Sequence, residues 1–179
     1  MSGVKKVLSV LLLCFLLVSC GEEREKTIQE LAEAGDVDAQ NNLGEMYETG
    51  RDFAKAIEWY RKSAEQGNAH GQFKLGTMYS RSLGVPFDDV EAVKWYRKSA
   101  EQGDADGQAE MGLMYALGAG VPQDNVKSYM FYNLVAAKGF ENIKARRNEI
   151  EEKMTQEQIA EGEKLTREWL ARKAKENGE

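Results

Sequence analysis

Two residue types in this chain of 179 residues could supply reactive sulfur or imidazole: two cysteines, Cys14 and Cys20, and a single histidine, His70. One imidazole without partner thiols cannot form the usual transition-metal site, and the chain has no His-Glu-x-x-His pattern. We expect Cys14 to be removed with an N-terminal segment, which leaves one thiol and therefore neither a disulfide nor a cysteine metal site. The remaining chain also lacks Ser-x-x-Lys, so serine acylation has no candidate. We therefore expect no metal, no cofactor and no catalytic residue.

Cys20 closes an N-terminal segment that is typical of exported proteins. Lys5 and Lys6 precede a run over residues 7–18 that is apolar except for Ser9, shorter than the roughly 20 residues of a membrane-spanning helix. The sequence Leu17-Val18-Ser19-Cys20 resembles a bacterial lipobox. This resemblance implies that the Cys20 thiolate accepts a lipid and that Cys20 becomes the first residue of the mature chain. An ordinary cleaved signal and an uncleaved anchor remain alternatives.

The charge balance disfavours two classes of partner. The chain has 24 basic and 30 acidic residues, a net charge of −6. Removing Lys5 and Lys6 would make it more negative still, which disfavours nucleic acid and weakens attraction to anionic lipid. We therefore expect acyl chains on Cys20 to hold the protein at a membrane, because each buried methylene contributes about 0.8 kcal/mol.

The rest of the chain repeats itself. The segment Trp59-Tyr60-Arg61-Lys62-Ser63-Ala64-Glu65-Gln66-Gly67 recurs 36 residues later, beginning at Trp95, and a degenerate third copy begins at Phe131. A period of this length is typical of stacked repeats. Apolar residues within each copy follow the i, i+3, i+4 spacing of a helix. Each unit is thus predicted to be a helix A, a loop, a helix B and a tight turn.

Residues at the ends of the predicted helices support this division. Gly67 and Gly103 stand just past helix B, where a positive φ is needed, and Asn68 and Asp104 follow as N-caps. Asp88, with Glu91 three residues later, predicts a capping box at the start of a helix B. The two prolines, Pro86 and Pro122, fall in the same A–B loop column, where proline ends helix A.

Other recurring residues predict core packing. The aromatic and methionine columns recur at the same repeat positions, which favours packing between helices over a ligand site; they are Trp59, Trp95, Tyr47, Tyr79, Tyr115, Met46, Met78 and Met114. Gly44, Gly76 and Gly112 lie inside helix A, where glycine costs about 1 kcal/mol relative to alanine. We expect a neighbouring helix to approach closely there.

The repeated unit resembles Sel1-like repeats, which are related to tetratricopeptide repeats. The resemblance lies in three recurring patterns: Ala/Gly-Gln-x-x-Leu-Gly-x-Met-Tyr, Gly-Val-Pro-x-Asp and Ala-x-x-Trp-Tyr-x-Lys-x-Ala-Glu-Gln-Gly. The resemblance implies an all-α, right-handed α-solenoid of antiparallel helix pairs. Three repeats are expected within 35–140, at 35–66, 67–102 and 103–138. They would follow a lipoprotein signal peptide, 1–19, and a lipid-anchored N-terminus with a capping helix, 20–34. Capping helices and a charged tail that frays from Arg172 would complete the chain over 141–179.

Partner specificity is expected at helix-A positions that differ between repeats. By analogy with tetratricopeptide repeats, helix A lines the concave face, and six partner-binding candidates lie one turn from the Leu-Gly pair: Asn41, Glu45, Phe73, Thr77, Ala109 and Leu113. Phe73 and Leu113 are apolar where the first repeat has polar residues, as a partner site would be. The alternative is that the superhelical twist buries both. We expect Phe73→Ala to keep the helix content and weaken partner capture; a clear fall in melting temperature would instead place Phe73 in the core.

The sequence therefore predicts a noncatalytic, monomeric scaffold of the bacterial cell envelope that binds another protein or peptide. Gly21 follows Cys20 in place of an aspartate that resembles an inner-membrane retention signal, which favours the outer membrane, facing the periplasm. A β-lactam-active or cell-wall-modifying enzyme remains an alternative, although the helix-bridging cysteines of cysteine-rich Sel1-like proteins are absent. Nitrocefin turnover would distinguish it. An immunity or inhibitor protein that plugs an effector is a third possibility.

Overall fold

The computed structural model describes residues 27–178, and all regular secondary structure within that range is helical. The chain divides into two compact units, one ending at Ser63 and the other beginning at Ala64, and each is described by itself. The signal peptide predicted over 1–19 and its Cys20 lie outside the described residues.

The first unit contains a helical segment over residues 27–33, helix α2 (Val37–Thr49) and most of α3 (Phe53–Glu65). Its core joins Ala32, Ala39, Leu43 and Trp59, all buried. The helical segment falls within the N-terminal capping helix expected over 20–34. The loop between α2 and α3 is short because Gly50 caps α2 and α3 begins at Phe53.

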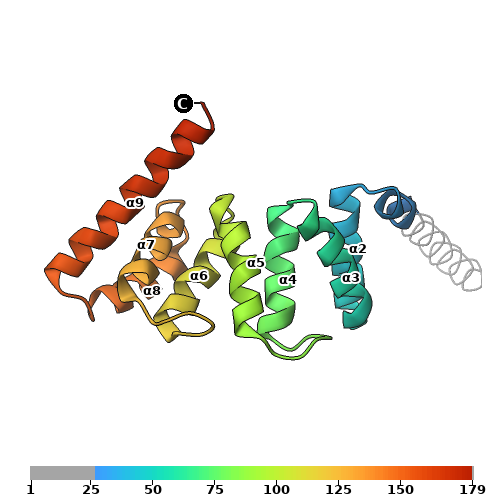
Figure 1. The fold of residues 1–179 in the computed structure, drawn as a ribbon, viewed down its shortest axis with the longest axis horizontal. Coiled ribbons are helices and arrows are strands. Elements are labelled where there is room, and N and C mark those ends of the chain that lie inside the picture. Colours follow the sequence, from blue (N-terminus) through green and yellow to red (C-terminus); the bar gives the residue numbers. More distant parts are fainter. Residues whose placement is uncertain (1–26, 179) are drawn as a thin grey trace, which may run out of the picture. The chain divides into compact units, whose positions relative to one another are not determined.

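The second unit is a succession of paired helices (Figure 1). In chain order they are α4 (Ala69–Ser80), α5 (Asp89–Glu101), α6 (Ala105–Leu117), α7 (Asn125–Ala136), α8 (Glu141–Glu151) and α9 (Gln156–Glu176). Each of the helices α4 to α7 packs on the next in the chain, and α7 packs on both α8 and α9. This arrangement confirms the predicted all-α solenoid of helix pairs.

The predicted helix caps are present. Asn68 Oδ1 accepts from the Gly71 N–H at 2.9 Å, and Asp104 Oδ1 accepts from the Gly107 N–H at 2.8 Å. The preceding turns need a residue that tolerates a left-handed backbone, and the φ of Gly103 is 86°. Local sequence therefore fixes where each helix A begins.

The capping box predicted at Asp88 and Glu91 forms only in part. Asp88 Oδ1 accepts from the Glu91 N–H at 2.9 Å. The Glu91 carboxylate does not return to the cap, because it accepts from Trp95 Nε1 at 3.1 Å and from Lys94 Nζ at 2.6 Å. A complete capping box forms instead at α9, between Thr155 and Gln158.

The core prediction is confirmed for the tryptophans. Trp59 and Trp95 are buried, and the ammonium groups of Lys62 and Lys98 cover their rings at 3.7 and 4.1 Å from the ring centroids. The close approach predicted at the helix-A glycines is also found: Gly44, Gly76 and Gly112 each lie against a helix-B tyrosine, namely Tyr60, Tyr96 and Tyr132.

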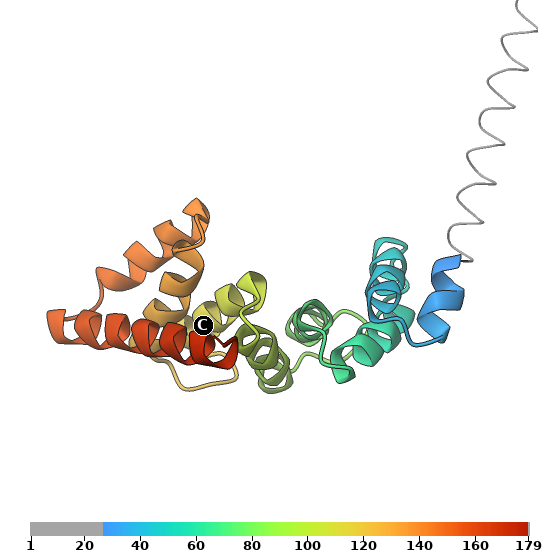
Figure 2. The same cartoon turned by 90° about the horizontal axis from the view of Figure 1, so that it is seen from above.

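The expectation of a frayed tail from Arg172 is wrong over most of that segment. Helix α9 continues to Glu176 (red in Figure 2). Glu176 lies within ion-pair distance of both Arg172 and Lys173, one turn earlier. Such i, i+3 and i, i+4 pairs each stabilise an exposed helix by a few tenths of a kcal/mol. Lys173 and Lys175 also lie in the last turn, where the helix dipole favours basic residues.

Candidate functional site

The first-repeat candidates lie on α2. The side chain of Asn41 is buried, whereas that of Glu45 is partly exposed. One turn further, Glu48 Oε2 accepts from the Tyr60 hydroxyl at 2.6 Å. Burial raises the pKa of Tyr60, and the nearby Glu48 carboxylate raises it further. Of these three α2 side chains, those that solvent reaches, Glu45 and Glu48, are therefore acidic.

The second-repeat candidates, Phe73 and Thr77, lie one turn apart on α4. Thr77 is buried: its hydroxyl donates to the Phe73 carbonyl oxygen at 3.1 Å and accepts from the Tyr96 hydroxyl at 3.4 Å. The Phe73 ring is partly exposed, with its centroid 6.1 Å from the ring centroids of both His70 and Tyr96. Thr77 thus supports the helix pair, while Phe73 has one side on the core and one side open.

The third-repeat candidates lie on α6. Ala109 is partly buried against a cluster that includes Tyr129 and Tyr132. Leu113 is partly exposed. Since α4 and α6 contact one another, Phe73, Ala109 and Leu113 belong to neighbouring helices of one unit. These three residues are called the helix-A surface below.

Sequence reasoning missed Glu110, which lies on α6 next to Ala109. Its carboxyl group is partly buried, and that burial raises its pKa; Arg81 and Arg146 oppose the effect, and Asp106 adds to it. The corresponding positions in the other repeats are Asn42 and Lys74. This repeat position is neutral in the first repeat, basic in the second and acidic in the third, and that variation was the signal that could have identified Glu110.

Two arginines from different helices thus act on Glu110. Arg81 caps the C-terminus of α4, and Arg146 lies on α8. Arg146 also lowers the pKa of Tyr132, although burial dominates and the net shift is upward. Charged groups of both signs therefore accompany the apolar helix-A surface.

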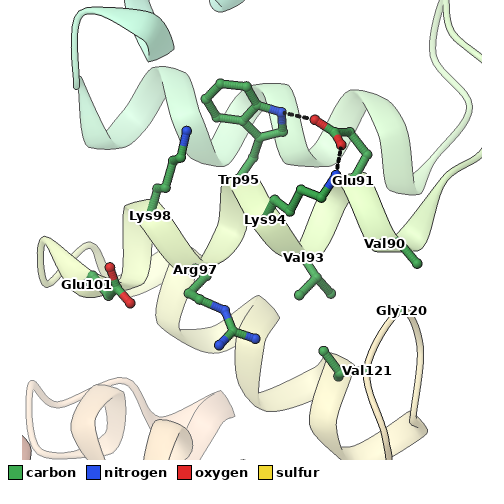
Figure 3. Close-up of a pocket in the computed structure, with 10 residues that line it drawn as sticks. All are labelled: Val90, Glu91, Val93, Lys94, Trp95, Arg97, Lys98, Glu101, Gly120 and Val121. Atoms are coloured by element: carbon green, nitrogen blue, oxygen red, sulfur yellow. Dashed lines mark hydrogen bonds and ion pairs between the residues drawn. The ribbon is translucent and has the colours of Figure 1, made fainter.

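A separate hollow of about 440 Å³ lies along α5 (Figure 3). It is called the α5 hollow and is lined by Val90, Glu91, Val93, Lys94, Trp95, Arg97, Lys98, Glu101, Gly120 and Val121. Figure 3 shows the valines of α5 and Val121 on one side and the basic side chains along the helix. Sequence reasoning did not identify this surface.

Two properties of the described part of the chain bear on function. Between residues 27 and 178, no group of three or more histidine, cysteine, aspartate or glutamate side chains is arranged to hold a metal ion. Within the same range, no helix has the length and apolar character needed to cross a membrane.

Comparison with known sequences identifies the repeats. Residues 37–68, 69–104 and 105–140 each match the sequence model of the Sel1 repeat. A sel1-like repeat-containing protein of Acanthamoeba polyphaga mimivirus is 35% identical over 85 residues, which cover 44% of this chain and 16% of the relative. This chain therefore spans about a sixth of that protein's length.

Two solved structures are similar in fold. A protective antigen of uropathogenic Escherichia coli strains, which displays an SLR fold, superposes with a TM-score of 0.80 at 32% identity, covering 84% of this chain and 33% of the antigen. A Sel1 repeat protein from Oxalobacter formigenes gives a TM-score of 0.66 at 36% identity, covering 71% of this chain and 54% of that protein.

Proposed function

Because the chain belongs to the Sel1 repeat family, whose repeats generally serve as protein-interaction scaffolds, we propose that it is a noncatalytic scaffold that binds another protein through the helix-A surface. The observation that carries this proposal is the partial exposure of Phe73 and Leu113 on two helices that contact one another. Both residues are apolar where the first repeat has the polar residues Asn41 and Glu45.

The chemistry around these residues supports protein binding. Partly exposed apolar side chains can anchor a partner, and charged groups beside them can fix its orientation. Glu110 supplies a carboxylate, and Arg81 and Arg146 supply guanidinium groups. Because a carboxylate kept from water gains from an additional cation, a basic group on the partner would be favoured near Glu110.

We further propose that the protein is displayed in the bacterial cell envelope by acyl chains on Cys20, at the outer membrane and facing the periplasm. The support is the sequence alone: an apolar run that ends in Leu17-Val18-Ser19-Cys20, with Gly21 after it. Under this proposal the scaffold concentrates its partner at a membrane surface.

Quantitative capture from native membranes tests the binding proposal. The full chain carrying Leu113→Glu is compared with Ala160→Glu, which adds the same charge at an exposed position of α9. We expect chemical crosslinking and mass spectrometry to find one or more proteins that the parent and Ala160→Glu enrich and that Leu113→Glu loses, while circular dichroism is unchanged in both. Equal enrichment by the two variants would overturn the assignment of the surface.

A further inference from the structure

The α5 hollow has an apolar floor that is open to solvent. Val93 is buried beneath it, whereas Val90 is 56% exposed. Gly120 and Val121 form the opposite wall. The wall lies close to the helix, because a Cβ at Gly120 would be 2.3 Å from the Asp89 carbonyl oxygen. The hollow is therefore built by a loop pressed against the first turn of α5.

The α5 hollow is lined by three basic side chains, Lys94, Arg97 and Lys98, and by two acidic ones, Glu91 and Glu101, which leaves a small excess of positive charge. Lys94 pairs with Glu91 at 2.6 Å. Arg97 donates to the Tyr115 hydroxyl at 3.4 Å, and Lys98 lies over the Trp95 ring. Over the described residues 27–178, neither Arg97 nor Lys98 has a carboxylate within ion-pair distance, although the whole chain has a net charge of −6.

The equivalent positions of α7, in the next repeat, show what kind of element can pack on this face of a helix B. Val126 and Tyr129 of α7 stand 36 residues after Val90 and Val93. Helix α9 packs on α7, and its Gly162 lies directly on these two residues. A Cβ at Gly162 would be 2.7 Å from Tyr129 Cδ1 and 3.4 Å from the Val126 carbonyl oxygen. In α7, therefore, a helix lies where the loop of Gly120 and Val121 lies on α5, and that loop leaves Val90 exposed.

We propose that the α5 hollow binds an acidic amphipathic helix of a partner protein. An aliphatic side chain of that helix lies between Val90 and Val121, and its carboxylates lie beside Arg97 and Lys98. Helices recognise grooves in this way through apolar residues spaced by three or four positions, and carboxylate–guanidinium contacts add orientation. This surface is distinct from the helix-A surface, so the inference goes beyond the proposed function.

The probe for this proposal is a synthetic peptide with the sequence of residues 156–168. It is the first part of α9, it carries Ile159 and Leu165, and its four glutamates exceed its two basic residues. Fluorescence anisotropy of the labelled peptide with the full chain in detergent is expected to show saturable binding below about 1 mM. A matched peptide with Ile159→Ser and Leu165→Ser should lose that binding.

Protein variants locate the site. The double variant Arg97→Glu/Lys98→Glu and the single variant Val90→Asp should each weaken peptide binding by about tenfold or more. The control Lys153→Glu/Lys175→Glu makes the same change in net charge at exposed residues outside the hollow, and it should bind within about twofold of the parent. Absence of saturable binding, equal weakening by the two double variants, or full binding by Val90→Asp would each overturn the proposal.

Discussion

The Cβ position of Gly76 lies 2.7 Å from Cδ1 of Tyr96, closer than two carbon atoms can approach without a shift. The same position is 3.1 Å from the Ala92 carbonyl oxygen, so α4 and α5 meet with no room for a methyl group. The absence of a side chain allows the Tyr96 ring to cross α4 and bring its hydroxyl to Ser80 Oγ at 2.8 Å. Glycine and tyrosine thus form one packing unit, which recurs in each repeat.

Replacing Gly76 by alanine should destabilise the protein. The added methyl group must displace either the Tyr96 ring or the α5 backbone, and such overpacking costs about 1–3 kcal/mol. Thermal unfolding followed by circular dichroism should show a fall of several degrees. The control is Gly50→Ala, whose φ is −74° and whose added Cβ would meet only backbone oxygens, at 3.4 Å or more. Equal melting temperatures for the two variants would contradict the packing account.

Replacing Glu110 by glutamine should stabilise the protein at neutral pH. Burial raises the pKa of Glu110 in the folded state above its ordinary value of 4.5. The folded state therefore holds this proton more tightly than the unfolded state, and ionisation costs stability as the pH rises above 4.5. Below pH 4.5 both states are protonated and the cost disappears.

The expected result for Glu110→Gln is thus a higher melting temperature at pH 7 and a difference that closes below pH 4.5. Glu168→Gln, at an exposed position of α9, is the matched control and should shift the melting temperature little at either pH. A Glu110→Gln variant that is less stable than the parent at pH 7 would show that attraction by Arg81 and Arg146 outweighs burial.

Replacing Phe73 by alanine should have an intermediate effect on stability. One side of the ring packs on the core and the other is open, so we expect a loss of about 1–2 kcal/mol, below the 3–5 kcal/mol of a fully buried phenylalanine. Helix content should be retained, but the melting temperature should fall by several degrees. Because the ring packs partly on the core, such a fall alone no longer excludes Phe73 from the surface, and the size of the loss decides. Leu117→Ala, at a side chain that is 67% exposed, serves as the control. A loss as large as that of a buried residue would remove Phe73 from the proposed binding surface.

Lipid attachment can be tested with the two cysteines of the chain. Cells grown with an alkyne-bearing palmitate should label the parent and Cys14→Ser, because Cys14 lies within the predicted signal peptide. Cys20→Ser should not be labelled, since its hydroxyl cannot replace the thiolate as nucleophile. Labelling of Cys20→Ser, or loss of labelling in Cys14→Ser, would contradict the lipobox assignment.

The repeat pattern predicted much of the fold because each of its columns has a local physical cause. Asn68 and Asp104 cap helices through their own side chains, and Gly76 marks a contact that no other residue permits. Such effects act over a few residues or recur with the repeat. A single sequence was therefore sufficient to place the helices and their core faces.

The candidate site was predicted less completely because it depends on neighbours from other helices. Thr77 was expected to face a partner, but the Tyr96 hydroxyl lies over it and the residue is buried. Glu91 was expected to close a capping box, but its carboxylate instead accepts a hydrogen bond from Trp95 Nε1, one turn further along α5. Burial raises the pKa of Glu110, and the arginines that oppose this effect, Arg81 and Arg146, lie 29 residues before it and 36 residues after it.

Site-specific photocrosslinking in the native host tests most directly whether the helix-A surface binds a partner protein. A photoreactive amino acid replaces Leu113 in one variant of the full chain and Ala160 in another, since Ala160 is exposed on α9. The account predicts that irradiation yields a discrete crosslinked protein from position 113, which is absent from position 160 and is reduced when Phe73 is also replaced by alanine. Crosslinks of equal yield and identity from both positions, or none from position 113, would contradict it.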